Sequence, residues 1–326
     1  MDSIPSLSIR RHTSLLTRFP EILSYANQEK KSAGWIVFSK QLTAANFDVM
    51  DNYLGECTPI LDCWKVGHYD VVAMAGTLTD DHRDILIRLG LDFAEINAFP
   101  ELSQPGLLLM DMDSTAIQIE CIDEIAELAG VGSEVAEVTE RAMQGELDFA
   151  QSLYQRVGAL TGADESILKQ VRDTLPLMPE LKELLKTMKS LGWKIAIASG
   201  GFTYFTDHLK QMLDLDFAQS NTLEVIDGKL TGKVLGDVVS AQSKAKILIE
   251  LAEKYDIEIE NTVAVGDGAN DLVMMKAAGL GIAYHAKPKV EQQAQTAIRV
   301  AGLGGVLCIL SASLLLSGKL SWQKRA

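Results

Sequence analysis

The chain has few cysteines, and their spacing predicts neither a disulfide framework nor a zinc site. Only four cysteines occur in 326 residues, none of them in a CxxC pair, and no histidine stands at metal-ligand spacing from any of them. Structural zinc sites need such clusters. We therefore expect buried free thiols, which are typical of a reducing compartment, and a cytoplasmic location.

The chain also lacks any surplus of basic residues. It has 44 acidic and 30 basic side chains, with a formal net charge of −14. Nonspecific binding to a nucleic-acid backbone requires clustered lysines and arginines, so we expect no nucleic-acid partner. A small anionic ligand held by a few local groups is not excluded by this balance.

Long apolar runs are scarce, and only one needs to be compared with a membrane span. The first residues, MDSIPSLSIRRHTSLLTRF, contain an arginine pair but no continuous apolar stretch, so they do not predict a secretory signal. The uncharged run between Arg299 and Lys319 is long enough to span a bilayer. Its glycines and serines dilute its hydrophobicity, and a helix packed on a large sheet gives the same pattern. We favour the packed helix and expect no membrane partner.

No internal repeat or low-complexity tract is present, and the length suits about two domains. We predict a polar extension over 1–33 and a linker over 101–106. Between them, residues 34–100 have the order strand, helix, strand, strand, helix, strand. This order predicts an α+β domain of ACT-like (ferredoxin-like) type.

Residues 107–326 alternate apolar runs with helical patterns. Three of the runs end in polar residues: LLLM precedes DMDST, WKIAIA precedes Ser199-Gly200-Gly201, and TVAVG precedes DGAND. Continuous apolar runs are typical of parallel strands covered on both faces, so we predict an α/β fold with a Rossmann-like parallel sheet. The Glu-, Ala- and Leu-rich stretch at about 116–185 is too long for one crossover helix and predicts an inserted helical cap.

The polar residues at the three strand ends should share the carboxyl edge of one sheet, where such sheets bind ligands. Asp111 and Asp113, taken alone, could be a helix cap and a solvated loop residue. Asp267 and Asp271 would join them at this edge, however, and four converging carboxylates repel one another unless a cation is present. Hard oxygen donors of this kind suit Mg²⁺.

A second group of residues could hold an anion. Ser199 and the two glycines after it offer a hydroxyl and exposed backbone N–H groups, although a helix cap with a tight turn has the same pattern. Lys244 could reach the edge as a point charge, and spacing alone does not favour it over Lys246.

Together, DMDST, the Ser-Gly after the second run, a downstream lysine and GDGAND resemble the haloacid dehalogenase superfamily of phosphotransferases. The form DMDST followed by IECIDEIAELAG resembles the members that hydrolyse phosphoserine. The resemblance extends from about Gly106 to the C-terminus. It implies Mg²⁺-dependent hydrolysis of O-phospho-L-serine to serine and phosphate through an aspartyl-phosphate, the last step of serine biosynthesis. Cation pumps, which also form an aspartyl-phosphate, are excluded because no transmembrane bundle is predicted.

The resemblance also implies roles for the acidic residues. Asp111 would be the nucleophile, and Asp113 would be the general acid and base. Mg²⁺ would be held by the Asp111 carboxylate, the Asp113 backbone carbonyl and Asp267. Asp271 would not bind the metal directly but would help to orient its ligands.

For the phosphoryl group, the resemblance implies binding by Ser199, Gly200, Lys244 and Asn270, and it favours Lys244 over Lys246. For the rest of the substrate it implies that Glu120 binds the ammonium and Arg156 the carboxylate, while Met143 and Phe149 line the apolar side. Taken alone, Arg156 would be read as a solvated charge on a helix.

Two alternatives stay open at this point. The enzyme could transfer the phosphoryl group to another alcohol, such as homoserine, or the chain could be a regulatory binding protein with an inactive phosphatase domain. The intact set of acidic residues argues against the second alternative. The N-terminal domain could sense serine, form a homodimer or buttress the core, and its sequence does not decide between these roles.

Overall fold

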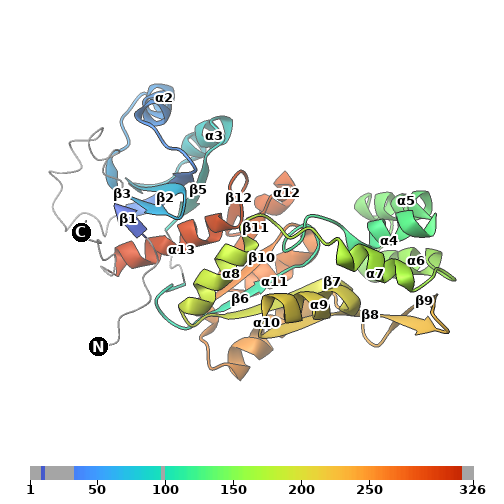
Figure 1. Cartoon of the computed structure of the whole chain (residues 1–326). Helices are drawn as coiled ribbons and strands as arrows, with labels where there is room; N and C mark the ends of the chain where they lie inside the picture. The colour runs from blue at the N-terminus through green and yellow to red at the C-terminus, as the bar shows by residue number, and fades with distance from the viewer. Residues whose placement is uncertain (1–8, 12–32, 97–99, 318–326) are drawn as a thin grey trace.

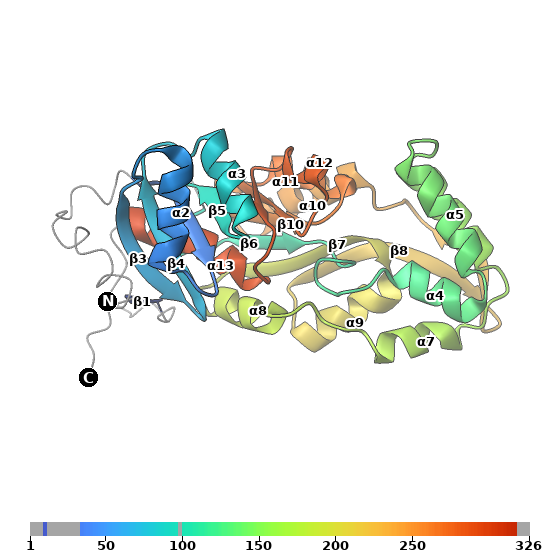
Figure 2. The same ribbon diagram turned by 90° about the horizontal axis from the view of Figure 1, so that it is seen from above.

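The structure is a computed structural model that describes residues 9–11, 33–96 and 100–317. Figures 1 and 2 show an elongated molecule with an antiparallel sheet at one end, a large sheet in the middle and a group of helices at the other end. The predicted extension lies mostly outside the described residues. The exact domain boundaries remain a proposal.

The N-terminal sheet has five antiparallel strands in the order β1-β3-β4-β2-β5. Its elements are β1 (Ile9–Arg11), β2 (Ala33–Ser39), α2 (Ala44–Leu54), β3 (Ile60–Val66), β4 (Tyr69–Ala75), α3 (Asp80–Arg88) and β5 (Asp92–Glu95). The order from β2 to β5 confirms the predicted α+β domain, whereas its ACT-like identity stays a prediction. Strand β1 was not predicted, because a strand this short has no detectable alternation within a polar segment.

Both faces of this sheet are buried. Trp35 and Val37 of β2 pack with residues of α2 and α3, whereas Ile36 and Phe38, on the opposite face, join the large core that contains α13 (Gly304–Leu316). Figure 1 shows α13 under the sheet and α2 and α3 above it. This double burial explains why the strands read as nearly continuous apolar runs. Because α13 covers the second face, homodimerisation through this domain stays a prediction that would have to use its edges or helices.

The central sheet has seven strands in the order β12-β11-β10-β6-β7-β8-β9, and all neighbouring pairs except β8 and β9 are parallel. The strands are β6 (Leu107–Met110), β7 (Lys194–Phe202), β8 (Phe217–Ile226), β9 (Lys229–Leu235), β10 (Thr262–Gly266), β11 (Leu280–Tyr284) and β12 (Thr296–Ile298). The flanking helices are α8 (Leu181–Ser190), α9 (Thr203–Leu213), α10 (Ala241–Lys254), α11 (Leu272–Ala277) and α12 (Pro288–Glu291), with short 3-10 turns η3 (Ile259–Asn261) and η4 (Ala269–Asp271). This arrangement confirms the predicted Rossmann-like core.

The second polar strand end differs in detail from the prediction. Strand β7 does not end before Ser199 but continues to Phe202, with an irregularity in its pairing to β8 between Ala198 and Phe202. Two adjacent glycines allow the backbone to depart from regular pairing without ending the strand. The antiparallel β8–β9 hairpin beyond it was not predicted; it packs against the cap helix α6.

The inserted helices between β6 and β7 are α4 (Cys121–Ala129), α5 (Gly132–Met143), α6 (Phe149–Ala159) and α7 (Ser166–Asp173). We call these four helices the cap. Helix α8 lies within the range predicted for the cap, but it packs on β7 and α13 of the core. The chain therefore returns from the cap to the core over residues 174–180, which we call the return segment.

The uncharged C-terminal run forms α13, which is packed between the two sheets. Among the described residues, no helix is both long and apolar enough to cross a membrane. All four cysteines lie in the described ranges, and no disulfide joins them. Cys63, Cys121 and Cys308 are buried as expected, whereas the expectation was wrong for Cys57, which is exposed near the end of α2.

Candidate active site

Three neighbouring strands bring the predicted polar residues to one edge of the central sheet. Met110, the last residue of β6, is paired with Val265 of β10 and with Ile197 of β7. The residues that follow are therefore at the same level, and the Asp111 N–H donates to the Val265 carbonyl over 2.9 Å. The register alone places Asp111 beside the polar ends of β7 and β10.

Asp111, Asp267 and Asp271 form a cluster in which one carboxylate oxygen from each lies within 4.8 Å of the others. Burial, followed by the negative charge of Asp111, raises the pKa of Asp267 to about 7. Acidic groups this close resist simultaneous ionisation. Their oxygens are the ligands that a hard divalent cation prefers, and such a cation would offset their repulsion. Thr115, which is buried, adds a hydroxyl 3.4 Å from Asp267 Oδ1.

Asp271 has a more limited role in this cluster, because both of its oxygens have partners. Its Oδ1 accepts from Lys244 Nζ at 2.7 Å, and its Oδ2 accepts from the Gly268 N–H at 3.1 Å. A Cβ at Gly266 would lie 2.4 Å from the Asp271 carboxylate, so glycine is required there to admit it. This geometry suits a residue that orients the site.

The structure distinguishes the two candidate lysines. The Lys244 side chain is buried, and its Nζ lies 2.8 Å from Asp111 and 2.7 Å from Asp271. Burial alone would lower the pKa of Lys244, but the two carboxylates raise it above its usual value. Lys246 points outward, is 75% exposed and pairs with Glu250 at 3.5 Å. Only Lys244 reaches the sheet edge.

Asp113 lies close to this cluster but in a different environment. Its Oδ1 accepts from the Cys121 N–H at 3.1 Å, and a Cβ at Gly201 would lie 2.7 Å from its Oδ2. Burial, together with the charges of Glu120 and Asp111, raises the pKa of Asp113 well above its usual value. Asp113 therefore gives up its proton less readily than an ordinary aspartic acid.

The end of β7 supplies groups for an anion. Ser199 is buried, and its Oγ accepts from the Gly201 N–H at 2.9 Å. The Gly200 carbonyl accepts from Asn221 Nδ2 at 2.7 Å, and Asn221 Oδ1 accepts from the Val239 N–H at 2.8 Å. Asn221 thus ties the Ser-Gly-Gly turn to the segment that begins the Lys244 helix.

Asn270, the remaining predicted phosphoryl ligand, lies in η4 beside the acidic cluster. It is half-buried, and a Cβ at Gly268 would lie 2.2 Å from its Oδ1. The backbone at Gly268 therefore passes directly against this amide. A side chain at position 268 would displace it.

The cap contributes a second group of predicted residues. A Cβ at Gly200 would lie 2.6 Å from Phe149 Cζ, so this ring packs directly on the Ser-Gly-Gly segment at the end of β7. Glu120 accepts from Ser114 Oγ at 2.8 Å. Desolvation by neighbouring protein atoms, followed by the negative charge of Asp111, raises the pKa of Glu120, although part of the side chain is exposed to solvent.

Arg156 lies on α6, facing acidic residues. Burial lowers the pKa of Arg156, while the charges of Asp123, Glu120 and Asp113 oppose this decrease. Its Nε is buried without a hydrogen-bond partner. A buried donor without a partner costs free energy. This guanidinium is therefore suited to bind an anionic group of a ligand.

Met143 is the predicted residue that the structure does not bring to the others. It is 60% exposed at the end of α5, and its sulfur lies 3.2 Å from Lys287 Nζ of the core. We expected it to line the apolar side of the site. A side chain exposed to this extent does not exclude water, so of the two predicted apolar residues only Phe149 packs on the Ser-Gly-Gly segment.

Several supporting residues were missed by sequence reasoning. Ser114 adopts a left-handed backbone with φ of 54°, which directs its hydroxyl to Glu120. Thr115 and Asn221 contact the acidic cluster and the Ser-Gly-Gly segment, respectively. The motif DMDST contains Ser114 and Thr115 and could have revealed them, whereas nothing in the local sequence distinguishes Asn221.

Comparisons with known proteins agree with this geometry. The sequence model of haloacid dehalogenase-like hydrolases matches residues 106–279, and that of a domain of unknown function, DUF5609, matches residues 31–95. The chain therefore belongs to the haloacid dehalogenase-like hydrolases.

The relatives define the family more narrowly. The chain is 65% identical to a phosphoserine phosphatase of Vibrio cholerae, over 100% of this chain and 99% of the relative, and 52% identical to that of Haemophilus influenzae, over 92% and 96%. It belongs to the phosphoserine phosphatase family.

Solved structures give the same result. The unliganded probable phosphoserine phosphatase of Vibrio cholerae has a TM-score of 0.88 and 66% identity, covering 98% of each chain. A phosphoserine phosphatase described as a phospho-aspartyl intermediate analogue has a TM-score of 0.60 and 42% identity, covering 63% of this chain and 98% of the other.

Proposed function

We propose that this enzyme hydrolyses O-phospho-L-serine to L-serine and phosphate through an aspartyl-phosphate on Asp111. The observation that carries the proposal is the buried Arg156 Nε, which has no hydrogen-bond partner and lies within the electrostatic influence of Asp123, Glu120 and Asp113. One base and one acid beside a phosphoryl site match the carboxylate and the ammonium of phosphoserine. The named relatives support the same substrate.

In the first step, an Asp111 oxygen attacks phosphorus and the bond from phosphorus to the serine oxygen breaks. Asp113, whose pKa is raised by burial and by the charges of Glu120 and Asp111, gives its proton to the leaving oxygen. In the second step, Asp113 takes a proton from water as that water attacks phosphorus, and the bond to Asp111 breaks. Dividing the reaction in this way replaces one difficult displacement by two easier ones.

Lys244 and the Ser-Gly-Gly segment at the end of β7 stabilise the charge of the phosphoryl group. The ammonium lies 2.8 Å from Asp111, so it is already in place when the phosphoryl group arrives. Ser199, Gly200 and Asn270 supply neutral donors around the same point. Fixed donors in a site of low polarity stabilise developing charge without reorganisation.

We propose Mg²⁺ as the cation of this site. Asp111, Asp267 and the backbone carbonyl of Asp113 would hold it, and Asp271 would orient the group. When bound, Mg²⁺ supplies positive charge that neutralises phosphoryl oxygens and offsets the repulsion between the carboxylates. The acidic cluster, with the pKa of Asp267 raised to about 7, is the observation that supports a cation here.

Removal of divalent cations should abolish activity reversibly. We expect less than about 1% of activity after treatment with EDTA, and recovery when Mg²⁺ is added in excess, because the uncompensated carboxylates repel a phosphate dianion. Phosphate release measures both. An Asp267→Asn variant should need a higher Mg²⁺ concentration for half-maximal activity. Full activity in EDTA would contradict a cation-dependent site.

Substrate preference should depend on the cap residues. Arg156→Lys and Glu120→Gln should lower kcat/KM for phosphoserine about 30- to 100-fold, since each removes a charge-assisted bond worth roughly 2–3 kcal/mol. The same variants should change kcat/KM for p-nitrophenyl phosphate less than about 3-fold, because that substrate has no ammonium or carboxylate. An equal loss on both substrates would contradict the assignment of these residues to serine recognition.

A further inference from the structure

The carboxylate of Glu180 lies where the N-terminal sheet meets the return segment. Tyr69 of β4 donates its hydroxyl to this carboxylate at 2.8 Å, and His68 Nε2 lies 3.0 Å from it. The Gly304 N–H, at the start of α13, donates to the same group at 3.0 Å. One side chain of the core thus joins the N-terminal domain, the helix between the two sheets and the last residue of the return segment.

Glu180 adopts an unfavourable backbone conformation in making these contacts. Its φ of 68° is in the left-handed region, which costs a residue with a side chain free energy unless the surroundings fix it. It is also the residue immediately before α8. The hydrogen bonds from Tyr69 and Gly304 can offset this cost, together with the basic side chains of His68 and Lys40, which lie 3.0 and 3.6 Å from the carboxylate.

Tyr69 and two glycines near the start of α13 pack closely around the Glu180 carboxylate. Tyr69 is 2% exposed, and its hydroxyl oxygen accepts from the Gly302 N–H at 2.9 Å while its proton goes to Glu180. A Cβ at Gly302 or at Gly304 would lie 2.7 Å from Glu180 Oε2. Both positions therefore need glycine for the Glu180 carboxylate to sit where it does.

The return segment is paired with the segment through which the chain enters the cap. The Met178 N–H donates to the Ala116 carbonyl and the Gln118 N–H to the Pro176 carbonyl, both at 2.9 Å. Ala116 in turn donates its N–H to the Met112 carbonyl at 2.8 Å, within the DMDST motif. A displacement of the return segment would therefore reach the strand end that carries Asp113.

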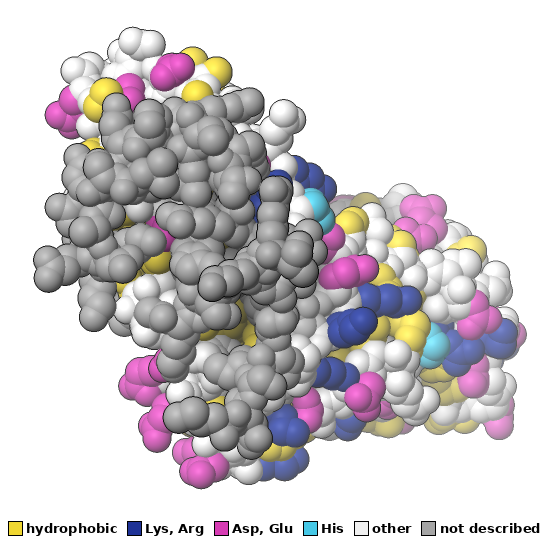
Figure 3. Space-filling view, turned by 60° about the vertical axis from the view of Figure 1, so that its left-hand side comes forward, with side chains coloured by type: hydrophobic (Ala, Val, Ile, Leu, Met, Phe, Trp, Pro, Cys, Tyr) yellow, Lys and Arg dark blue, Asp and Glu magenta, His cyan; other side chains and the backbone are white. Residues whose placement is uncertain are grey.

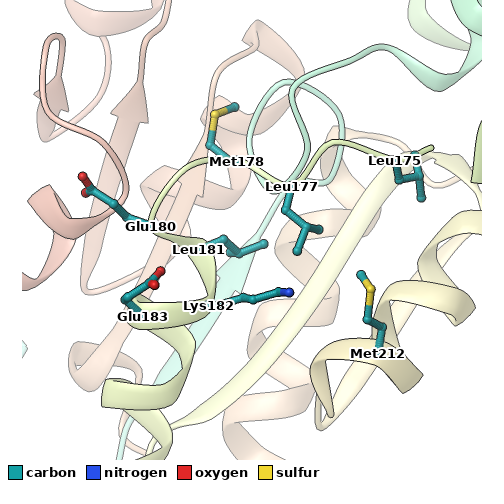
Figure 4. A pocket seen from close by; sticks show the side chains of 8 residues that line it. All are labelled: Leu175, Leu177, Met178, Glu180, Leu181, Lys182, Glu183 and Met212. Atoms are coloured by element: carbon teal, nitrogen blue, oxygen red, sulfur yellow. The ribbon is translucent and has the colours of Figure 1, made fainter. Parts of the chain in front are cut away.

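The return segment packs only partly on the core, through the half-buried side chains of Leu175, Leu177 and Met178. A cavity of about 420 Å³ borders it, lined by Leu175, Leu177, Met178, Glu180, Leu181, Lys182, Glu183 and Met212. Figure 4 shows Leu177 and Leu181 directed into this space, while the Glu180 carboxylate points away from them. Residues 175–178 are all only half-buried. The polar contacts of Glu180 therefore add a fixed end to a segment that is otherwise held by its pairing with residues 116–118 and by partly buried side chains.

We propose that Tyr69 of the N-terminal domain is a positioning residue for the reaction, acting through Glu180 to fix the return segment and with it the cap. The inference rests on the proposed function. Glu120 and Arg156 lie on the cap side of the paired segments, whereas Asp111 and Lys244 lie on the core side. Their alignment therefore depends on this junction, and the N-terminal domain contributes to activity without touching the substrate.

Tyr69→Phe tests the proposal, with Ser311→Ala as the matched control. The control removes the hydrogen bond from Trp64 Nε1 to Ser311 Oγ (2.8 Å), which also joins the N-terminal sheet to α13 but does not contact the return segment. We expect Tyr69→Phe to lower kcat/KM for phosphoserine about 10-fold, since one hydrogen bond to a charged group is lost. Turnover of p-nitrophenyl phosphate should change less than about 2-fold, and Ser311→Ala should leave both substrates within about 2-fold of wild type.

Amide hydrogen exchange gives a second readout that needs no substrate. Exchange in residues 115–119 and 174–180 should accelerate in Tyr69→Phe and in Glu180→Gln but not in Ser311→Ala, and the double variant should be no worse than either single one. Equal losses on both substrates, or exchange in Tyr69→Phe that matches Ser311→Ala, would overturn the proposal. If wild type failed to hydrolyse phosphoserine, the proposed function would fail while the exchange comparison still decided the role of Tyr69.

Discussion

Asp111→Asn will abolish turnover of phosphoserine, with a loss of at least about 10⁴-fold in kcat, because an amide cannot form the aspartyl-phosphate. Asp111 follows the central strand β6, and its carboxylate lies 2.8 Å from Lys244. The substitution keeps the size of the side chain and removes one charge from a crowded acidic cluster. Phosphate release under saturating substrate measures the effect.

The fold should survive this change. The matched control is Asp48→Asn, which makes the same substitution at an exposed position on α2. We expect full activity for Asp48→Asn and circular dichroism spectra that match wild type for both variants. Retained turnover in Asp111→Asn, in a preparation free of wild-type protein, would contradict the proposed nucleophile.

Lys244→Met will reduce both activity and stability. The ammonium is buried between Asp111 and Asp271, and its removal leaves these two carboxylates without their countercharge. Breaking a buried ion pair from one side typically costs about 3–5 kcal/mol in the free energy of unfolding. Loss of the charge that faces the phosphoryl group should lower kcat by about 10²- to 10³-fold.

Lys246→Met is the matched control for this prediction. Lys246 lies on the same helix, is 75% exposed and has only a surface pairing with Glu250. Its substitution should change the free energy of unfolding by no more than about 0.5 kcal/mol and leave activity unchanged. Urea denaturation and phosphate release measure both variants. Similar losses in the two would show that position on the helix, and not contact with the carboxylates, decides the effect.

The net charge of the chain is compatible with an anionic substrate because the attraction is local. Figure 3 shows acidic and basic side chains interspersed on the visible face, outside the residues drawn in grey. The excess of acids therefore does not gather into one repulsive surface on that face. Inside the site, Lys244 and Arg156 supply the positive charge that the composition as a whole lacks.

The sheet edge could be predicted from the sequence because its signals are local. Each of the three apolar runs is long enough to be a covered strand, and polar residues follow each run closely. Parallel strands share one carboxyl edge, so the sequence predicts that Asp111, Asp267 and Ser199 lie together. The structure agrees because the register of β6 with its two neighbours leaves no other arrangement.

Other parts of the site depend on contacts between distant segments and could not be predicted. Asn221 lies on the neighbouring strand β8 and donates to the Gly200 carbonyl in the Ser-Gly-Gly segment of β7. The residues around Asn221 in the sequence show no special pattern. The apolar sequence of α13 indicates burial but does not say which sheet it covers. The resemblance implies that Met143 lines the site, yet its side chain is 60% exposed.

Glu180 is a further example of this limit. Its sequence context, between a proline and a helix, predicts an ordinary exposed acid at the start of α8. Only the folded chain brings Tyr69 and Gly304 to the same carboxylate. A role for the N-terminal domain in positioning the cap therefore emerges from tertiary contacts that sequence reasoning alone does not provide.

The central claim is that Asp111 becomes phosphorylated while Asp113 moves protons. In an Asp113→Asn variant with p-nitrophenyl phosphate, whose leaving group needs no proton, the phosphorylated enzyme should form but hydrolyse slowly. Acid quenching and reduction with borohydride convert an aspartyl-phosphate into homoserine, which peptide mass spectrometry can locate. We expect homoserine at position 111 and at no other acidic residue. Reduction at another residue, or none at 111 while a burst of p-nitrophenol is released, would contradict this claim.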